Sequence, residues 1–580
     1  MGGRPLRVRI AALAGALAMG MAAPAAHAHA ARPWHAALNP AGPSCNWPMF
    51  GQNPARTFTT QCQEAPDPTN VGRLLPRWYF HANDVITASP AIVDGTVYVG
   101  AWDGTFYALD FATGKVLWKT TLGTNRTDGH PDHHTGAYGI ITSSAAVATV
   151  GHRRLVFVGG GDTMWALDAS RRSMPDRRRV VWAVNLDPKH PTSDGEIESS
   201  PVVWSGAKGG PVVIFGSDAN QDSGYTGEGM WELRAATGRL VFHFNPETYL
   251  HHSLYGCGNV WSSPALALDP NASKVSRRAM LYFGTADCPD NGNNPCPSDG
   301  SDQYCRPGGH YDYRHRWTRL SQAILAISAV TGKPVWSYQP FPRNDISDDD
   351  FGASAQLFTL PSGRQVVGEA NKSGSYYVVD RHTGKPLWNR PETGNGNLQA
   401  GFALGGLLGS TAVLPVSATP TVFGGAAINT PVYFNERAGE ENLQPPASIA
   451  AIATPLVGFS GTTGAHVWSA VQAPTYSPTT AANGVVYSGA VDDVLRAYDA
   501  QTGAILWAFP LTAPISSGAA VTANGLVIGA GTSESDVEFK TCDNLPGPLQ
   551  EPCKATPLNA TLNPLSKANG IWAFSLSSPS

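Results

Sequence analysis

A short motif recurs eight times along this 580-residue chain. Each copy contains an apolar strand, a turn that is most often Thr-Gly, and a large aromatic residue just after the turn. The first complete copy runs from residues 107–110 through Thr113 and Gly114 to Trp118. The following six copies end at Trp182, Phe242, Trp336, Trp388, Trp468 and Trp507. Repeats of this length that are made of short strands predict a propeller, an array or a solenoid.

The eighth copy is divided between the two ends of the chain. Its strand at 571–574 is followed by no aromatic residue, and the strand at 75–80, which holds Trp78, has no copy before it. We therefore expect these two strands to pair and to close a ring. Four antiparallel strands form one propeller blade, and a closed ring protects the sheet edges. The fold class predicted is all-β, an eight-bladed β-propeller closed by pairing of N- and C-terminal strands.

The recurring Trp and Gly residues have a structural explanation. Trp is a large apolar plate, and Gly lets two backbones approach closely, so both are expected at the packing surfaces between blades. The charged fraction of 14% lies below the usual value of about 25%. A net charge of −4 without a basic run indicates no nucleic-acid partner. Although the length suggests several domains, the repeat predicts one propeller over 45–580.

The first 30 residues have the pattern of a cleaved secretory signal peptide. Arg4, Arg7 and Arg9 precede an apolar run over 10–26, and small residues follow at 26–30 in the A-x-A spacing of a cleavage site. No later segment has about 18 uninterrupted apolar residues, so no membrane span is expected. This pattern predicts a secreted or periplasmic protein.

Eight cysteines in an exported chain favour disulfides. Proximity in sequence suggests the pairs Cys45–Cys62 and Cys542–Cys553. The other four lie around one long insertion: Cys257, Cys288, Cys296 and Cys305. A metal site is the weaker alternative, since no pair has C-x-x-C spacing.

The first strand of each blade lines the channel of a propeller, and here these strands carry Ser-Pro or Ser-Ser signals. The residues just before the signals should converge at the channel mouth. They comprise Thr87, Thr142, Glu198, Trp261, the Asp pair that ends at Asp350, Tyr476 and Ile515. Hydroxyls, carboxylates and one Trp around an axis favour a flat, anionic ligand that is bound with the help of a metal.

Five stretches carry a resemblance to a known family, namely 46–51, 258–264, 282–287, 347–352 and 371–376. Together with the repeat, they make the chain similar, over about 45–580, to quinoprotein alcohol dehydrogenases. The polyvinyl-alcohol-dehydrogenase-like branch is the most similar. The resemblance implies an eight-bladed propeller that binds pyrroloquinoline quinone (PQQ) and calcium.

The resemblance also implies roles for single residues. Trp261 would form the floor under the quinone, and Lys372 would contact the quinone oxygens. Asp287 and Asp348 would bind calcium, with Asp348 also the general base, and Asp350 is the second Asp of that segment. Carboxylate oxygens are hard ligands that suit calcium. The Glu that completes the calcium site has no clear match, with Glu198 and the loop 217–222 as candidates, while Thr142 is expected at the cofactor.

Some family features are absent, and purely structural explanations of the matching residues stay open. Residues 138–144 stand where the family has two adjacent cysteines followed by an Arg, and Ser347 replaces a usual Trp. Taken alone, the run 345–350 reads as a solvated acidic turn, Lys372 as a turn lysine and Trp261 as ordinary core. Their occurrence together, in family order, favours the cofactor site.

The residues outside these stretches are less informative. His130, His133 and His134 could bind a metal, but a solvated loop over the channel is the simpler explanation, and the same holds for 251–252. The insertion near 288–316 is expected to be a disulfide-pinned cover at the channel mouth. A second insertion near 396–450 has no assigned role.

Two functions follow from the resemblance. The first is a secreted oxidoreductase that oxidises an alcohol, with polymeric or secondary alcohols among the candidates. PQQ would accept the hydride and calcium would act as Lewis acid. Electrons would pass to a separate acceptor such as a cytochrome c, since the sequence lacks a C-x-x-C-H haem motif. The alternative is a non-catalytic propeller that acts as a binding or assembly scaffold.

Overall fold

The computed structural model describes most of the chain from residue 45 onwards. The described ranges are 45–122, 140–170, 175, 178–188, 195–218, 227–249, 259–269, 272–286, 305–306, 310–311, 320–340, 350–393, 406–416, 419–427, 433–435, 440–442, 454–473, 475–531 and 569–576. All of them belong to one unit, Asn39–Ser580.

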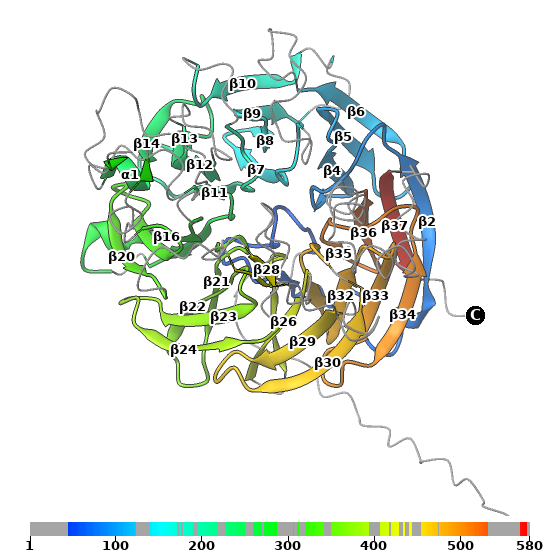
Figure 1. Ribbon diagram of the computed structural model, residues 1–580. Helices are drawn as coiled ribbons and strands as arrows, with labels where there is room; N and C mark the ends of the chain where they lie inside the picture. Colours follow the sequence, from blue (N-terminus) through cyan, green and yellow to red (C-terminus); the bar gives the residue numbers. More distant parts are fainter. Residues whose placement is uncertain are drawn as a thin grey trace, which may run out of the picture. The chain divides into compact units, whose positions relative to one another are not determined.

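Eight antiparallel sheets are arranged as a ring (Figure 1). In each sheet, here called a blade, four strands pair from the channel outwards, in chain order except that β2 (Leu74–His81) is the outermost strand of the last blade. One blade also has β1 (Thr59–Thr60) beside its first strand. These eight blades confirm the eight-bladed propeller that the repeat predicts. In such a meander, the first and third turns of a blade lie at one face of the ring, here called the turn face. The second turn and the link to the next blade lie at the opposite face, here called the loop face.

The strand bounds in the first four blades are as follows. Blade 1 has β3 (Ala91–Val93), β4 (Thr96–Gly100), β5 (Thr105–Asp110) and β6 (Val116–Thr121). Blade 2 has β7 (Ala146–Val150), β8 (Arg153–Gly160), β9 (Thr163–Asp168) and β10 (Val180–Asn185). Blade 3 has β11 (Val202–Trp204), β12 (Val212–Ser217), β13 (Gly229–Arg234) and β14 (Leu240–Phe244). Blade 4 has β15 (Ala265–Leu268), β16 (Ala279–Gly284), β19 (Ile324–Ser328) and β20 (Pro334–Tyr338).

The remaining blades follow the same plan. Blade 5 has β21 (Gln356–Thr359), β22 (Gln365–Ala370), β23 (Ser375–Asp380) and β24 (Pro386–Pro391). Blade 6 has β25 (Ala412–Val416), β26 (Thr419–Gly425), β29 (Thr454–Ser460) and β30 (His466–Gln472). Blade 7 has β31 (Thr480–Ala482), β32 (Val485–Gly489), β33 (Val494–Asp499) and β34 (Ile505–Pro510). Blade 8 has β35 (Ala520–Thr522), β36 (Gly525–Ala530), β37 (Gly570–Leu576) and β2 (Leu74–His81). Smaller elements are β1 (Thr59–Thr60), η1 (Val71–Arg73), α1 (Pro246–Tyr249), η3 (Val275–Arg277) and the hairpins β17 (Cys305–Arg306) with β18 (His310–Tyr311) and β27 (Tyr433–Asn435) with β28 (Glu440–Asn442).

Blade 8 is built from both ends of the chain. β2 pairs antiparallel with β37, from Leu74 opposite Leu576 to His81 opposite Gly570. β37 pairs on its other side with β36, so the C-terminal strand lies between two partners that are remote from each other in sequence. The predicted closure of the ring by its termini is confirmed.

One contact, repeated around the ring, explains the aromatic motif. The ring of Trp78 packs against Gly114 in the third turn of blade 1, and its Nε1 donates a hydrogen bond of 2.8 Å to the carbonyl of Phe111. Gly114 has a φ of +69° and no space for a side chain, because a Cβ would lie 2.6 Å from the indole. The same packing joins Trp182 to Gly238, Phe242 to Gly332, Trp336 to Gly384, Trp388 to Gly464 and Trp468 to Gly503. The motif therefore holds successive blades together, as predicted.

Residues 45–64, here called the plug, cross the turn-face end of the channel. Backbone hydrogen bonds join the plug to the first strands of six blades, through the pairs Trp47–Ile92, Pro48–Val147, Pro54–Leu266, Ala55–Leu357, Thr57–Val413 and Phe58–Ala481. In blade 8, Thr522 donates a 2.6 Å bond to the Cys45 carbonyl, and in blade 3 the Ser200 carbonyl accepts one from Arg56. The plug thus contacts all eight blades.

Arg56 is the central residue of the plug. It is fully buried, with a φ of +54°, and its guanidinium donates to the carbonyls of Pro264 (3.0 Å), Ser200 (2.6 Å) and Phe50. Burial lowers the pKa of Arg56 to about 9, since the charged form loses its hydration. The buried carbonyl oxygens that accept these bonds would be left without donors if the guanidinium were removed.

The predicted Cys45–Cys62 disulfide is present and closes the plug, whereas the other predicted cysteine pairs lie outside the described side chains. Replacing both residues with Ser should lower the free energy of unfolding by about 3 kcal/mol, the loop-closure value for a loop of this size. Urea unfolding of the wild type and the double variant, both under non-reducing conditions, measures the difference. Equal unfolding midpoints of the two proteins would show that this disulfide does not stabilise the plug.

Candidate functional site

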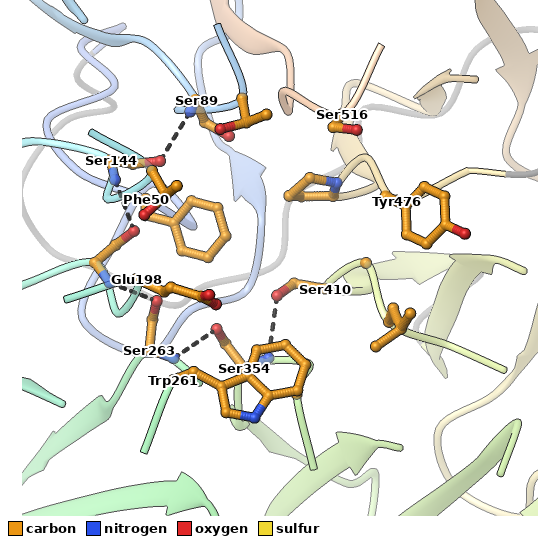
Figure 2. Close-up of a pocket in the computed structure, with 17 residues that line it drawn as sticks. Phe50, Ser89, Ser144, Glu198, Trp261, Ser263, Ser354, Ser410, Tyr476 and Ser516 are labelled. Atoms are coloured by element: carbon orange, nitrogen blue, oxygen red, sulfur yellow. Dashed lines mark hydrogen bonds between the residues drawn. The ribbon is translucent and has the colours of Figure 1, made fainter. Parts of the chain in front are cut away.

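A cavity of about 160 Å³ occupies the channel on the loop-face side of the plug. Phe50 of the plug is part of its lining (Figure 2). Every blade contributes residues that lie just before its first strand, mostly as pairs two positions apart. The pairs are Thr87 and Ser89, Thr142 and Ser144, Glu198 and Ser200, Trp261 and Ser263, Gly352 and Ser354, Leu408 and Ser410, and Tyr476 and Pro478, with Ser516 from blade 8.

The serines form a belt of hydrogen bonds around the cavity. The backbone N–H of Ser89 donates to the hydroxyl of Ser144 at 2.8 Å, and the N–H of Ser144 donates to the hydroxyl of Ser200 at 3.0 Å. The same bond continues from Ser200 to Ser263, Ser263 to Ser354 and Ser354 to Ser410 (Figure 2). The Gly518 N–H donates to the hydroxyl of Ser89. These bonds satisfy buried N–H groups between blades, which explains the recurring Ser signal. The residues two positions earlier are left to face the cavity.

Most of the predicted channel residues line the cavity. Thr142, Glu198 and Trp261 do so, as do Thr87 and Tyr476. The prediction for blade 8 is wrong: Ile515 is fully buried and packs against Gly489, while Ser516 lines the cavity.

In blade 5 the cavity is lined by Gly352 and Ser354, and not by Asp350. Leu408, Gly409 and Phe50 are lining residues that the sequence analysis missed. Counting two residues back from each belt serine would have found Gly352 and Leu408.

Trp261 lies across the cavity because Gly352 leaves room for it. A Cβ on Gly352 would lie 1.7 Å from Cη2 of the indole, so any other residue would push the ring away. The indole thus has a fixed place with a large flat surface beside the channel axis. Such a surface suits a planar ligand.

A buried ion pair lies beside this indole. The Nζ of Lys372, in the second turn of blade 5, is 2.7 Å from Oδ2 of Asp350 and 5.3 Å from the centroid of the Trp261 ring. The two charged side chains are 12% and 7% exposed. The backbone also joins the two segments, since the Lys372 N–H donates to the Asp350 carbonyl at 3.0 Å. The structure therefore brings together three of the predicted site residues.

The cavity wall is more polar on one side than on the other. Blades 1 to 3 contribute Thr87, Thr142 and the Glu198 carboxylate, with their serines. Blades 6 and 7 contribute Leu408, Tyr476 and Pro478. A ligand with distinct polar and apolar edges would be oriented by this difference.

Two predicted calcium ligands, Asp287 and Asp348, lie outside the described residues, as do the histidines at 130–134 and 251–252. Most of the loop 217–222 and of the insertion near 288–316 lies outside them too. The second predicted insertion, near 396–450, is wrong in part, because β25 and β26 of blade 6 lie within it. Within the described part of the chain, one group of potential metal ligands comes close enough together, namely Cys45, Cys62 and Glu64. The disulfide occupies both sulfurs of that group, so it is not a metal site.

A fully buried carboxyl lies near the site, at the loop-face end of β22. Glu369 is three residues before Lys372, and a Cβ on Gly284 would lie 2.3 Å from its Oε1. Burial raises the pKa of Glu369 well above its ordinary value, because the low-polarity interior disfavours the charged form. The folded protein therefore holds a proton that the unfolded chain releases above about pH 4.5.

This raised pKa predicts how stability depends on pH. A folded state that retains a proton loses stability as the pH rises above the unfolded pKa. Glu369→Gln keeps the shape and removes the titration, so the variant should be more stable than the wild type at pH 8 and nearly equal at pH 4.5. Thermal unfolding of both proteins at the two pH values measures the difference in stability between variant and wild type. The same difference at pH 4.5 and pH 8 would contradict a raised pKa of Glu369.

No helix in the described residues is long and apolar enough to span a membrane.

A family model described as the β-propeller domain of glucose/ethanol/alcohol dehydrogenases, PQQ, matches residues 47–273 and 306–394, more than half of the chain. A second model, for the outer membrane protein assembly factor BamB, matches residues 449–538.

Curated relatives are similar at low identity. Lupanine 17-hydroxylase [cytochrome c] of a Pseudomonas species is 24% identical over 359 residues, which are 59% of this chain and 47% of that protein. The dehydrogenase subunit of the quinone alcohol dehydrogenase of Gluconacetobacter polyoxogenes is 23% identical over 384 residues, 59% of this chain and 45% of that one. The chain thus spans about half the length of the curated relatives it matches.

Solved structures share the fold. The quinohemoprotein alcohol dehydrogenase of Comamonas testosteroni has a TM-score of 0.61 at 17% identity, covering 92% of this chain and 81% of that one. A europium-containing methanol dehydrogenase has a TM-score of 0.62 at 17% identity, covering 92% and 98%. With the family model matching over more than half of its length, the chain belongs to the PQQ β-propeller family of glucose, ethanol and alcohol dehydrogenases.

Proposed function

We propose that the protein oxidises an alcohol with PQQ bound in the channel, and that calcium assists. The observation that carries this proposal is the placement of Lys372 and Asp350 beside Trp261 at the cavity. Relatives named as quinone-dependent alcohol dehydrogenases support the class of reaction. The alcohol itself is open, with polymeric and secondary alcohols as candidates.

The residues present fit a planar, anionic quinone. Trp261 offers a flat face that Gly352 leaves free to lie across the channel. Lys372 supplies a cation near this face, and hydroxyls such as that of Thr142 can donate to carboxylate oxygens. Two family features are absent from the sequence. Residues 138–144 contain no pair of adjacent cysteines, and no Arg follows directly after them.

When bound, the quinone would supply the hydride acceptor and calcium a Lewis acid. The role of Lys372 would be to stabilise negative charge that develops on the ligand's oxygens, because a preorganised cation does so without reorganising solvent. A carboxylate of the run 345–350 would accept the hydroxyl proton of the alcohol. Asp348 is the predicted base, and Asp350 is the carboxylate that the described residues bring to Lys372.

Calcium would be held by oxygen ligands. We propose Asp287 and Asp348 as ligands, with Glu198 as a third candidate on the polar wall of the cavity. Carboxylate oxygens are the ligands that calcium prefers. Electrons would leave to a separate acceptor such as a cytochrome c, and export by the N-terminal signal would place the protein outside the cytoplasm.

A scaffold without a cofactor is the second candidate. The BamB model matches one segment, 449–538, which includes blade 7 and not the residues beside Trp261. A scaffold needs the blade packing but has no use for a buried Lys–Asp pair that faces an indole, and a buried pair is costly to desolvate. The cofactor proposal explains this pair and the scaffold proposal does not.

PQQ binding tests the two proposals directly. Mixed with PQQ and calcium, the wild type should gain quinone absorbance and reduce an artificial dye on addition of an alcohol. Trp261→Ala should weaken PQQ binding roughly 10- to 100-fold, the value of one lost stacking contact. Trp261→Phe keeps an aromatic face and should recover most of the affinity. A wild type that binds no PQQ in fluorescence titration would favour the scaffold.

A further inference from the structure

Blade 4 departs from the repeat at its first turn. Ten residues, 269–278, join β15 to β16, whereas two residues join the matching strands in blades 1, 2 and 7. Two residues are therefore enough for blade packing. The longer turn carries the short helix η3 and the cations Lys274, Arg277 and Arg278. Departures from a rigid repeat in surface turns are the usual places for binding residues.

This turn forms one wall of a cavity of about 380 Å³ between blades 4 and 5. These two blades are neighbours in the ring (Figure 1). The apolar part of the wall comes from β15 and β16, through Ala267, Met280 and the ring of Tyr282. The opposite wall comes from the third turn of blade 5, with Arg381 and His382. Both turns lie at the turn face, away from the channel cavity.

Hydrogen bonds across the blade junction fix the shape of this pocket. Arg277 Nη1 donates to the His382 carbonyl at 3.3 Å, and the Tyr282 hydroxyl donates to the Arg381 carbonyl at 3.3 Å. The Arg381 carbonyl also accepts a 3.1 Å bond from Nε1 of Trp336. The pocket is therefore held in shape by contacts from two blades before any ligand arrives.

Positive charge dominates the lining. Lys274, Arg277 and Arg381 face one acidic lining residue, Asp269, in a chain whose net charge is −4. A second carboxylate, Asp380, lies nearby but has other partners. It accepts a 2.9 Å hydrogen bond from the Thr383 hydroxyl, and its Oδ2 lies 3.7 Å from Nε of Arg364.

One lining side chain keeps an unsatisfied donor. The Nε of Arg381 is buried and has no hydrogen-bond partner among the described residues. Burial raises the pKa of Tyr282 to about 12, so its hydroxyl stays protonated at neutral pH and keeps its bond to the Arg381 carbonyl. The Arg381 guanidinium would favour an acceptor that carries negative charge.

We propose that this pocket binds a small organic anion, a carboxylate or phosphate group on a short apolar body. Guanidinium and ammonium groups would hold the anionic head. The apolar strip of Ala267 and Met280 would cover the body. This site stands apart from the proposed alcohol oxidation, since it shares no lining residue with the channel cavity.

Calorimetric titration of the full chain at constant ionic strength tests the proposal, with inorganic phosphate, benzoate and phenyl phosphate as probes. At least one probe should bind saturably at one site per chain. Arg277→Gln should weaken that binding roughly tenfold or more, the value of one lost charged hydrogen bond. Lys274→Gln, at an exposed position, should weaken it less. Arg239→Gln removes the same charge from an exposed turn of blade 3 at the same face and should leave binding unchanged.

The probes also separate the two sources of negative charge. Tighter binding of phenyl phosphate and phosphate than of benzoate assigns the site to phosphate groups, and the reverse order assigns it to carboxylates. The proposal is overturned if no probe binds saturably, or if Arg239→Gln weakens binding as much as Arg277→Gln does. The result does not depend on PQQ, so failure here and failure of the proposed oxidation are distinguishable.

Discussion

A chain that ends just before Gly570 should lose its folded state. The deletion removes β37, whose Ile571, Ala573 and Phe574 are fully buried, and it exposes the edges of β2 and β36. Each fully buried large apolar side chain contributes about 1.5–3 kcal/mol. With the lost ladder hydrogen bonds, the loss approaches the 5–15 kcal/mol by which a whole domain is stable. Circular dichroism with thermal unfolding should show a missing or strongly lowered transition.

A second truncation gives the control. A chain that ends at Leu576 keeps all of β37 and should melt as the full-length protein does. A peptide of residues 566–580, added to the shorter chain, should restore part of the transition if β37 acts by pairing with β2 and β36. Unchanged melting of the shorter chain would show that the ring does not need its closing strand.

Replacement of a carboxylate in the run 345–350 should strongly reduce dye reduction. Asp348→Asn and Asp350→Asn each keep side-chain size and remove a carboxylate, and loss of a general base typically costs about 10²- to 10⁴-fold in rate. With PQQ and calcium at saturating concentrations, the variant with the larger loss identifies the base, provided that both variants melt as the wild type does. Equal activity of the wild type and both variants would contradict a base in this run.

Lys372 needs a different variant, because its removal leaves Asp350 buried without this cation. Breaking a buried pair is destabilising, so Lys372→Ala is expected to lower both activity and stability. A role in stability is expected because the side chain of Lys372 is only 12% exposed. The double variant Lys372→Met with Asp350→Leu removes both charges and should recover stability but not activity. If it also recovers activity, the pair has a structural role only.

The sequence predicts the ring well because the repeat encodes local contacts. Each aromatic residue and Thr-Gly turn recurs at a similar place in its blade, so one copy explains the others. The same regularity places Thr142, Glu198 and Trp261 at the cavity. It fails in blade 8, where the position equivalent to the belt serine is Gly518, so that Ser516 and not Ile515 faces the channel.

The ion pair and the plug are harder to predict for a physical reason. Asp350 and Lys372 are marked separately in the sequence, but their 2.7 Å contact depends on the register of two turns in blade 5. The plug has no repeat at all, and its partners range from Ile92 to Asn524. Contacts between residues so far apart leave no periodic pattern that a reading of the sequence could detect.

The plug also sets an order of events in folding. Residues 45–64 are synthesised before any blade, yet their last partner, Asn524, is made more than 400 residues later. The cost of closing such long loops must be met before these contacts form, which slows folding of chains rich in distant contacts. Cys45 and Cys62 are close enough in sequence to join early, as a small preformed loop. The blades would then assemble around the plug, whose loop has already formed. The hydrogen bond from Asn524 to the Glu64 carbonyl would form last, when the ring is complete.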